Sequence, residues 1–406
     1  MRSLWVVSGG VEAVAGVQRA KEMGLRVVVS DGSPQAPGLA HADDHLVVST
    51  YDVEATVAAA VQYHRTVCPI DGVMCIASDV PLTVASVAAA LELPGIPIES
   101  ARLAIDKLAM KQKFAADGIP VPWFSFIQSA EDLRERVREK GFPLVLKPVD
   151  SRGARGVLRL TEKVDLEWAY ATSRGYSPTG RVMVERFLPG PQVSTESIVL
   201  DGVAYTPGFA DRNYEYMERF APHIIENGGD LPSHLHPDTQ RDVCRLVEQA
   251  AASMGINNGV IKGDIVVTDN KPYVIEVAAR LSGGYFCTHE IPLNTGVDLV
   301  GEAIRLALGE KIEPARLMPR YQRFVSQRYL FPPPGRVTRI EGVEQVAARP
   351  GIELCEVRVS IGDIVKPVDS HPARAGVIIA TGDSREKAMN CAVSAVNDIV
   401  IETASV

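Results

Sequence analysis

The chain has 406 residues, of which 46% are hydrophobic and 23% are charged, and its formal net charge is −8. This length is enough for roughly two to four subdomains with buried cores. The negative charge gives no support to nucleic-acid binding, and no apolar run reaches the ~18–20 residues of a membrane span. The first residues lead straight into a strand rather than into a signal peptide.

Six cysteines are scattered along the chain and form no C-x-x-C pair. This usage is typical of buried free thiols in a reducing compartment. The composition therefore predicts a cytoplasmic protein.

Strand and helix signals alternate over residues 1–100, which predicts a parallel, doubly wound α/β sheet. A ligand of such a sheet would lie at the carboxyl ends of the strands, near Gly9, Asp31 and Asp79. The first turn, S-G-G-V-E-A-V-A-G, lacks the G-x-G-x-x-G spacing, and Glu12 would stand where a pyrophosphate belongs. These features argue against a dinucleotide site.

A Pro-rich connector, L-P-G-I-P-I-E-S, leads into a predicted helix that begins at Asp106. Residues 123–190 then form a compact block, in which three segments (strand and helix, strand and glycine loop, strand and helix) are followed by the strand V-M-V-E-R-F. More strands and helices follow up to about residue 310. A tail of strands with one helix, Arg385 to Ile399, begins at about Ala315.

The segment from Val260 to Gly284 predicts a β-hairpin, because I-V-V and Y-V-I-E-V flank the turn T-D-N-K-P. Pairing of the strands would bring Asp264 close to Glu276. Two adjacent carboxylates usually imply a cation or a shared proton, and hard oxygen ligands suit Mg²⁺. The alternative is a surface hairpin whose acids face water.

Lys147 lies on the predicted strand P-L-V-L-K-P-V, and the loop S-R-G-A-R-G follows it. Lysine and arginine side chains supply positive charge, and glycines allow the backbone to approach a ligand closely, so this pattern suits a polyphosphate. An exposed turn with scattered charges is the alternative.

Other metal and nucleotide motifs are absent or weak. No G-x-x-x-x-G-K-[ST] P-loop and no G-x-S-x-G elbow is present. His234 and His236 have no cysteine or H-E-x-x-H partner, which argues against zinc. On the strand V-M-V-E-R-F, Glu185 could accept a hydrogen bond from an adenine amino group or could simply face solvent.

In order, the motifs D-K-x-x-M-K, strand lysine, glycine loop, V-E-x-F-L-P-G, acid and E-x-x-x-R resemble the ATP-grasp superfamily over essentially the whole chain. The carboxylate–amine ligases, including L-amino acid ligases, are the most similar members, with biotin carboxylase and purine-pathway carboxylases further off. The resemblance implies an α/β (α+β grasp) fold. Its parts would be a preATP-grasp domain at 1–105, an ATP-grasp domain at 106–314 with a lid at about 123–190, and a C-terminal lobe at 315–406.

The resemblance also implies roles for individual residues. Asp264 and Glu276 would hold one or two Mg²⁺ ions, which Mn²⁺ could replace. Arg280 and Lys147 would be the catalytic residues, and Arg280 would stabilise the transferring phosphate. The residues that would bind ATP are Lys107, Lys147, Ser151, Arg152, Gly153, Gly156, Glu185, Arg186, Phe187, Leu188 and Gln192.

Two positions depart from the family pattern. Gln192 stands where many members have an acid for the ribose hydroxyls, although a glutamine still accepts a hydrogen bond. Ala278 replaces the asparagine of E-x-N-x-R, which removes one ligand of a second Mg²⁺.

The activity implied by the resemblance is ATP-dependent formation of an amide or peptide bond through an acyl phosphate, with release of ADP and phosphate. The partners would be a small carboxylate and an amine, with amino acids as the class, and the protein would be a homodimer. The loop 211–233 is rich in aromatic and charged residues and is similar to the acceptor segment of amino acid ligases. The candidate substrate residues are Glu196, Arg219, His223, Glu226, Gly283 and Gly284.

Two alternatives remain at this point. A carboxylase-type member would activate bicarbonate as carboxyphosphate, and the tail S-I-G-D-I-V-K-P-V-D-S-H-P-A-R-A-G is similar to the lobe after the grasp in biotin carboxylase. The second alternative is a nucleotide-binding subunit without catalytic activity. The candidate catalytic and metal residues argue against it, because all of them are present: Lys147, Asp264, Glu276 and Arg280.

Overall fold

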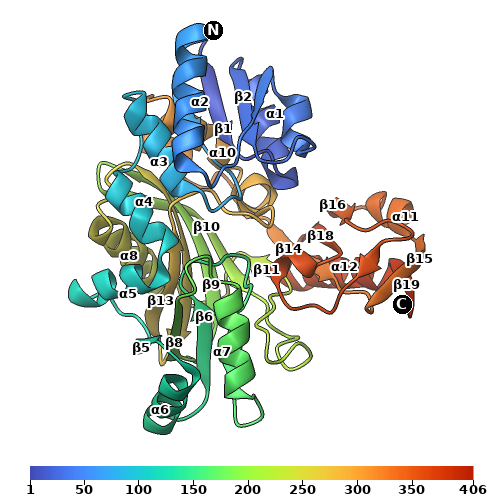
Figure 1. Ribbon diagram of the computed structural model, residues 1–406. Helices are drawn as coiled ribbons and strands as arrows, with labels where there is room; N and C mark the ends of the chain where they lie inside the picture. The colour runs from blue at the N-terminus through green and yellow to red at the C-terminus, as the bar shows by residue number, and fades with distance from the viewer. Residues whose placement is uncertain (406) are drawn as a thin grey trace.

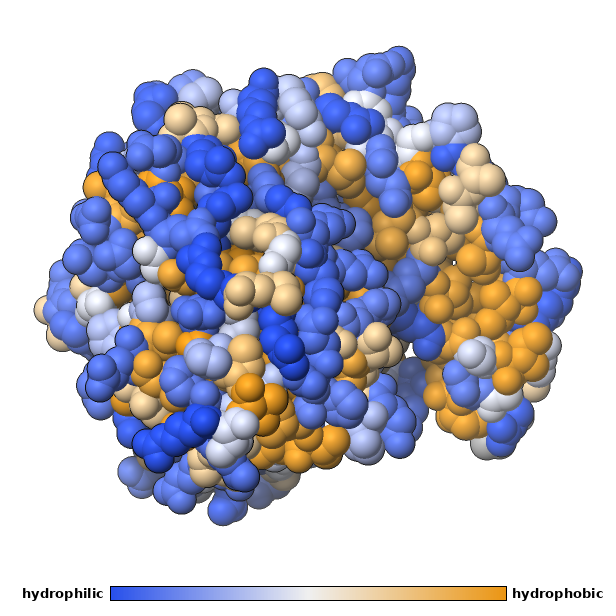
Figure 2. Space-filling view, turned by 90° about the horizontal axis from the view of Figure 1, so that it is seen from above, coloured by the Kyte–Doolittle hydropathy of each residue, from blue (hydrophilic) through white to orange (hydrophobic). Residues whose placement is uncertain are grey.

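The computed structural model describes residues 1–405 and shows an elongated main body with a lobe standing to one side (Figure 1). The N-terminal sheet lies at one end of the main body and the lid sheet at the other, with a large central sheet between them. Viewed along the perpendicular direction, the C-terminal lobe again stands apart, and apolar side chains gather on the face turned to the viewer (Figure 2).

The N-terminal sheet is parallel, as predicted, with strand order β3-β2-β1-β4. All residues of β1 are buried, because Leu4 and Val6 face one helical layer while Trp5 and Val7 face the other. The bounds are β1 Ser3–Val7, β2 Arg26–Asp31, β3 Asp44–Val47, β4 Gly72–Met74, and for the helices η1 Val11–Ala13, α1 Val14–Glu22, η2 Pro37–His41, α2 Val53–Thr66 and α3 Pro81–Ala90.

A helix from much later in the chain completes this domain. Val300 and Ile304 of α10 (Leu299–Ala307) pack in the same apolar cluster as β1 and α1. The N-terminal domain is therefore not made by residues 1–105 alone, and the division of the chain there remains a proposal.

Two consecutive helices connect the N-terminal sheet to the lid. The sequence predicts only the second, α5 (Lys107–Ala116), because the prolines before it suggest a connector; the structure adds α4 (Ile98–Ile105). Asp106 separates them and caps α5 by accepting a hydrogen bond from the Ala109 amide at 2.9 Å. This cap fixes the residue at which α5 begins.

The lid is a four-stranded antiparallel sheet with order β5-β8-β6-β7, covered on one face by two helices (Figure 1). Leu144 and Leu146 on β6 join the apolar core under the helices. Alternation along the strand then turns Lys147 to the other face, toward the central sheet. The bounds are β5 Phe124–Ile127, α6 Ala130–Lys140, β6 Leu144–Pro148, β7 Leu158–Leu160, α7 Leu166–Gly175 and β8 Val182–Arg186.

The central sheet has eight strands in the order β13-β12-β9-β10-β11-β14-β18-β16, and neighbouring strands are antiparallel. Its last three strands come from the region after residue 315, so the sheet runs continuously into the C-terminal lobe. The bounds are β9 Gln192–Leu200, β10 Val203–Arg212, β11 Gly229–Leu231, α8 Pro237–Ser253, β12 Gly259–Thr268, β13 Lys271–Ala278, η3 Phe286–Glu290, α9 Ile291–Thr295, β14 Phe324–Leu330, β16 Ile352–Val357 and β18 Gly376–Gly382.

The outer part of the C-terminal lobe is a small sheet with order β17-β15-β19, packed with the helix predicted near the end of the chain. The remaining elements are η4 Pro314–Leu317, β15 Gly335–Glu341, α11 Val343–Ala347, β17 Ile364–Val365, η5 His371–Ala373, α12 Arg385–Asp398 and β19 Val400–Ala404.

The six cysteines are all free, as predicted, but only Cys75 and Cys287 are buried. The expectation that all six are buried is wrong for the other four, which lie at partly exposed positions on helices, strands and a loop. Over residues 1–405, no helix is long and apolar enough to cross a membrane.

Candidate active site

A cavity of about 650 Å³ opens between the lid and the central sheet, a size typical of small-ligand sites. It is lined by all four parts of the molecule: the N-terminal domain, the lid, the central sheet and the C-terminal lobe. Most of the residues predicted to bind ATP or metal lie in its wall. The exceptions are described below.

The predicted hairpin of β12 and β13 forms the central wall of the cavity. Its turn is built by Asp269 and Asn270, both with positive φ (51° and 58°), as a type I′ hairpin turn requires. The ladder keeps the register of this turn as far as Ile265, and a register shift between Asp264 and Ile265 then places Asp264 directly opposite Glu276. The prediction that these two carboxylates lie side by side is confirmed.

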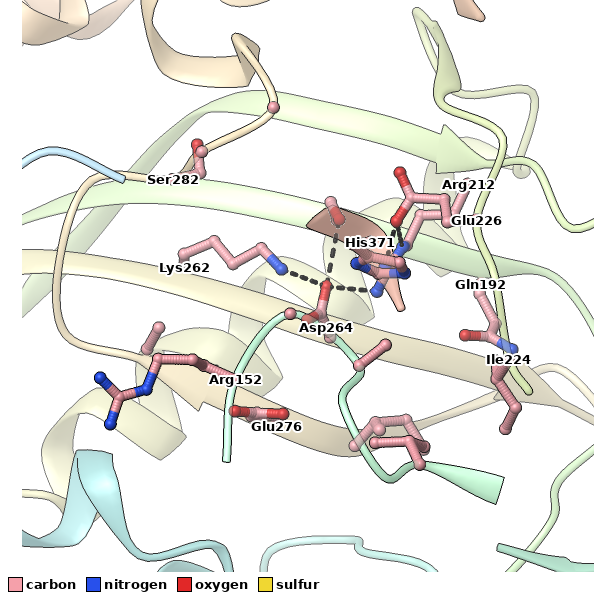
Figure 3. A pocket seen from close by; sticks show the side chains of 18 of the residues that line it. Arg152, Gln192, Arg212, Ile224, Glu226, Lys262, Asp264, Glu276, Ser282 and His371 are labelled. Carbon is pink, nitrogen blue, oxygen red and sulfur yellow. Dashed lines mark hydrogen bonds and ion pairs between the residues drawn. The ribbon is translucent and has the colours of Figure 1, made fainter. Parts of the chain in front are cut away.

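Asp264 is held by cations on both sides (Figure 3). Arg212 Nη1 lies 2.7 Å from Oδ1, and Lys262 Nζ bonds the same oxygen. Burial alone would raise the pKa of Asp264, but these two charges hold it well below its usual value. Asp264 is therefore ionised at neutral pH.

The donor set fits a hard divalent cation. Every contact of Asp264 within residues 1–405 goes to Oδ1, and Glu276 is bonded through Oε1 only, by Lys107 Nζ at 3.0 Å. Each carboxylate thus keeps one oxygen available in the cavity. Over the same residues no group of three or more His, Cys, Asp and Glu side chains is arranged so that it could hold a metal ion. This suits Mg²⁺, which takes one or two carboxylates and completes its shell with phosphate oxygens and water.

Ala278 lies in the cavity wall two residues beyond Glu276, on the same face of β13. Its methyl group has no oxygen to offer, so a second ion would lack a ligand at this position.

Two lysines meet one buried glutamate beneath the lid. Lys147 bonds Glu185 Oε1, and Lys111 Nζ lies 2.8 Å from Oε2, with all three side chains almost fully buried. Burial together with the charge of Lys147 lowers the pKa of Lys111 to about 8, although Glu185 opposes this. The pair Lys107 and Lys111, one helical turn apart on α5, is a signal that sequence analysis did not use for the second lysine.

The glycine loop is held over the cavity from two sides. Lys107 Nζ donates to the Ser151 carbonyl at 2.7 Å, and the His371 amide of the C-terminal lobe donates to the Gly153 carbonyl at 2.9 Å. Arg152 also stacks on the ring of Tyr51 from the N-terminal domain, at 4.2 Å. Three domains therefore touch this loop.

Gly156 does not line the cavity, in contrast to the prediction. Its φ is +72°, and an added Cβ would lie 3.0 Å from both Pro148 and Tyr176. This glycine therefore allows the loop to fold back against the lid instead of approaching a ligand.

The segment from Glu185 to Leu188, which was predicted to bind ATP, lines the cavity, and so does Gln192. The guanidinium of Arg186 points away and donates to the Gly141 carbonyl at 3.5 Å. Only the backbone of Arg186 is therefore placed to contact a nucleotide.

Arg280 reaches across to the N-terminal domain. Its Nε and Nη2 lie 2.8 and 2.7 Å from Oδ1 of Asp79, in the loop after β4. Burial would lower the pKa of Arg280, but Asp79 raises it above its usual value, so the guanidinium stays charged. Of the three residues expected at the strand ends, Asp79 lies in the cavity wall, while Gly9 and Asp31 do not.

The substrate candidates divide into two groups. Glu226, Gly283 and Gly284 line the cavity. Arg219 lies outside it and donates to the Phe331 carbonyl at 3.3 Å, and His223 lies outside it with its ring 6.4 Å from that of Trp168.

Glu196, also predicted to contact substrate, is fully buried behind the cavity wall. It accepts hydrogen bonds from the amide of Ser282, at 2.6 Å, and from its hydroxyl. It therefore holds the S-G-G turn in place and does not face a ligand. Burial raises the pKa of Glu196 to about 7 from 4.5.

This raised pKa predicts a pH-dependent stability. The stabilising contribution of the protonated Glu196 is present below pH 4.5 and is lost as pH rises through 7. The difference corresponds to about 3 kcal/mol. We expect the free energy of unfolding of the native protein to fall by about 2–3 kcal/mol more between pH 5 and pH 8 than that of Glu196→Gln. Urea unfolding of both proteins at the two pH values measures this, and parallel pH dependences would contradict it.

Sequence analysis missed several residues of the cavity. They are charged or titratable and come from segments far apart in the chain: Arg212, Lys262, Glu290, Arg358, His371 and Arg374. Lys262 was detectable, because it precedes Asp264 by two residues and so shares its face of the strand.

Comparison with known families agrees with this architecture. An ATP-grasp N-terminal domain matches residues 17–95, an ATP-grasp domain matches residues 104–284, and L-amino acid ligase C-terminal domain 2 matches residues 328–404. The chain therefore carries an ATP-grasp N-terminal domain, an ATP-grasp domain and a C-terminal domain of the kind described for L-amino acid ligases.

Individual relatives have low sequence identity to this chain. A D-alanine–D-alanine ligase from Acidovorax ebreus is 26% identical over 47% of this chain, and a formate-dependent phosphoribosylglycinamide formyltransferase from Burkholderia thailandensis is 27% identical over 94% of it and 91% of the relative. The chain spans 60–65% of the length of the first curated relatives that it matches. The solved L-amino acid ligase from Bacillus licheniformis shares the fold, with a TM-score of 0.84 at 22% identity over 100% of this chain and 99% of that one.

Proposed function

We propose that this protein is an ATP-dependent ligase that joins the carboxylate of one small molecule to the amine of another, with amino acids as the substrate class. The observation that carries this proposal is the convergence of Asp264, Glu276, Arg280 and Lys147 on one cavity beneath a glycine loop. The products are an amide, ADP and phosphate.

The arrangement suits phosphoryl transfer to a carboxylate. Asp264 and Glu276 would hold one Mg²⁺, which supplies charge neutralisation for the triphosphate. Lys147 and Lys107 supply further positive charge near the glycine loop, and Arg280, in the wall of the same cavity, would stabilise charge on the transferring group. The loop, held by Lys107 and His371, excludes water that would hydrolyse an acyl phosphate.

Acidic residues in the cavity wall support an amine as the second substrate. Glu226 is one of them, its carboxylate held by Arg212 Nε at 2.9 Å. The C-terminal lobe, which contributes Arg374 and His371, matches the domain described for L-amino acid ligases. The D-alanine–D-alanine ligase relative, as its name says, joins two amino acids.

The test is ADP release from Mg-ATP with amino acids supplied singly and in pairs. We expect release that requires two amino acids, with the dipeptide detected by mass spectrometry. Loss of ADP release on changing Asp264 or Glu276 is compared with a matched control, Asp269→Asn. This control changes an exposed acid in the turn of the same hairpin and leaves Asp264 and Glu276 intact. Release independent of any added amine would contradict the proposal.

A second candidate is a carboxylate-activating enzyme of the purine or carboxylase type. The observation in its favour is the alignment with the formyltransferase, which extends over 94% of this chain. ADP release that requires formate or bicarbonate, and no second amino acid, would support this candidate instead.

A further inference from the structure

An unpartnered acid lies at the inner end of the cavity. Glu290 ends the π-helical turn η3 that follows the S-G-G segment, and its side chain contributes to the cavity wall. It is only 3% exposed. Within residues 1–405, its carboxylate forms no hydrogen bond and no ion pair.

The nearest basic residue is already used. Arg328 is bonded through Nη1 to Asp230 Oδ1 at 3.1 Å and through Nη2 to Oδ2 at 3.2 Å. This bidentate contact occupies the guanidinium on the Asp230 side. Arg328 is therefore not available to neutralise Glu290.

The other acids at this end have partners, unlike Glu290. Glu226 is bonded by Arg212. Glu12 accepts a hydrogen bond from the Gly284 amide at 2.7 Å and lies 3.5 Å from Arg358. Glu290 alone adds an uncompensated carboxylate to the wall of the cavity.

A buried carboxylate without a partner is costly to ionise. Burial, together with the nearby Glu226 and Asp230, raises the pKa of Glu290 well above its usual value, and Arg328 only partly offsets this. A positively charged ligand in the cavity would reverse the balance, because an adjacent opposite charge favours the ionised form.

We propose that Glu290 binds a cationic nitrogen of the substrate, an ammonium carried either on the α-carbon or at the end of the side chain. This inference deepens the proposed function, on which it rests for the amino acid class. It assigns Glu290 as a specificity-determining residue, distinct from Glu226, whose charge is taken up by Arg212.

The test is isothermal titration calorimetry in the presence of Mg²⁺ and a non-hydrolysable ATP analogue, with matched pairs of ligands. L-Lysine and L-norleucine differ in the side-chain ammonium, and L-alanine and propionate differ in the α-ammonium. In at least one pair we expect the member with the additional ammonium to bind more tightly. Its dissociation constant should rise on the order of 100-fold in Glu290→Gln, while that of the member without this ammonium stays unchanged. The pair that responds identifies the position of the ammonium.

The matched control is Glu302→Gln. Glu302 is equally buried but lies outside the cavity, where Arg316 Nη2 contacts it at 2.6 Å. This change should lower stability and leave all four affinities unchanged. If Glu290→Gln does not fold, Glu290→Asp retains the charge on a shorter side chain and should weaken only the cationic ligand, by a smaller factor.

An equal effect of Glu290→Gln on the two members of both pairs would overturn the inference, as would no effect on any ligand, or no binding of any of the four ligands to the native protein. Because the measurement needs no turnover, its outcome is separate from that of the ligase proposal. Dipeptide formation that is unaffected by Glu290→Gln would leave the ligase function standing and remove the role of Glu290.

Discussion

Replacing Glu276 with glutamine is expected to lower kcat/KM for ADP release on the order of 10³-fold or more. Glu276 supplies one of the two carboxylates that fit Mg²⁺, and the register of the hairpin places it directly opposite the other, Asp264. The introduced glutamine would keep the volume of the side chain but not its charge. Lys107, which contacts Glu276 at 3.0 Å, would also lose its negatively charged partner and be held beneath the glycine loop by the Ser151 carbonyl.

The loss should carry the signature of a metal ligand. The apparent affinity for Mg²⁺, measured from the dependence of the rate on Mg²⁺ concentration, should fall, and a higher concentration should restore part of the activity. Asp264→Asn should behave similarly, and it should also leave Arg212 and Lys262 without their shared acceptor. Full activity of Glu276→Gln with unchanged Mg²⁺ dependence would remove the hairpin from the catalytic site.

The hairpin was predictable because its information is local. β-branched residues on both sides of a two-residue turn fix the strands, and the turn fixes the register from Thr268 back to Ile265. The pairing of Asp264 with Glu276 also needs the register shift between Asp264 and Ile265, which no turn residue reports. The order of the motifs was sufficient to assign the superfamily, and the N-terminal alternation of strands and helices was sufficient to predict a parallel sheet.

The rest of the site depends on contacts between segments that are distant in the chain. Arg212 reaches Asp264, and the His371 amide reaches the Gly153 carbonyl, only because the central sheet runs on into the C-terminal lobe. No local pattern reports such a contact. Glu196 shows the opposite error. It shares a face of β9 with the cavity residues Gln192 and Ser194, which suggested a ligand contact, but it is fully buried and its carboxylate is bonded by Ser282, a residue 86 positions further along the chain.

Arg280→Lys is expected to lower kcat on the order of 10³-fold, although the positive charge is retained. The guanidinium uses Nε and Nη2 to bond Asp79 and donates through Nη1 to the Leu281 carbonyl at 3.3 Å. A lysine ammonium is a point charge and cannot keep this contact while facing the transferring phosphate. Rapid-quench measurement of phosphoryl transfer, with Mg-ATP affinity measured separately, tests whether the loss lies in the chemical step.

Asp79→Asn separates the positioning of Arg280 from its chemistry. The introduced asparagine keeps an oxygen acceptor but loses the charge, so the partly buried guanidinium is left without a counter-ion, which should destabilise the fold more than it slows the reaction. We expect about a tenfold loss of kcat for this variant, and no further loss when it is added to Arg280→Ala, because both changes break one contact. If the losses instead multiply in the double variant, Asp79 acts on the reaction independently of Arg280, and the N-terminal domain contributes directly to catalysis.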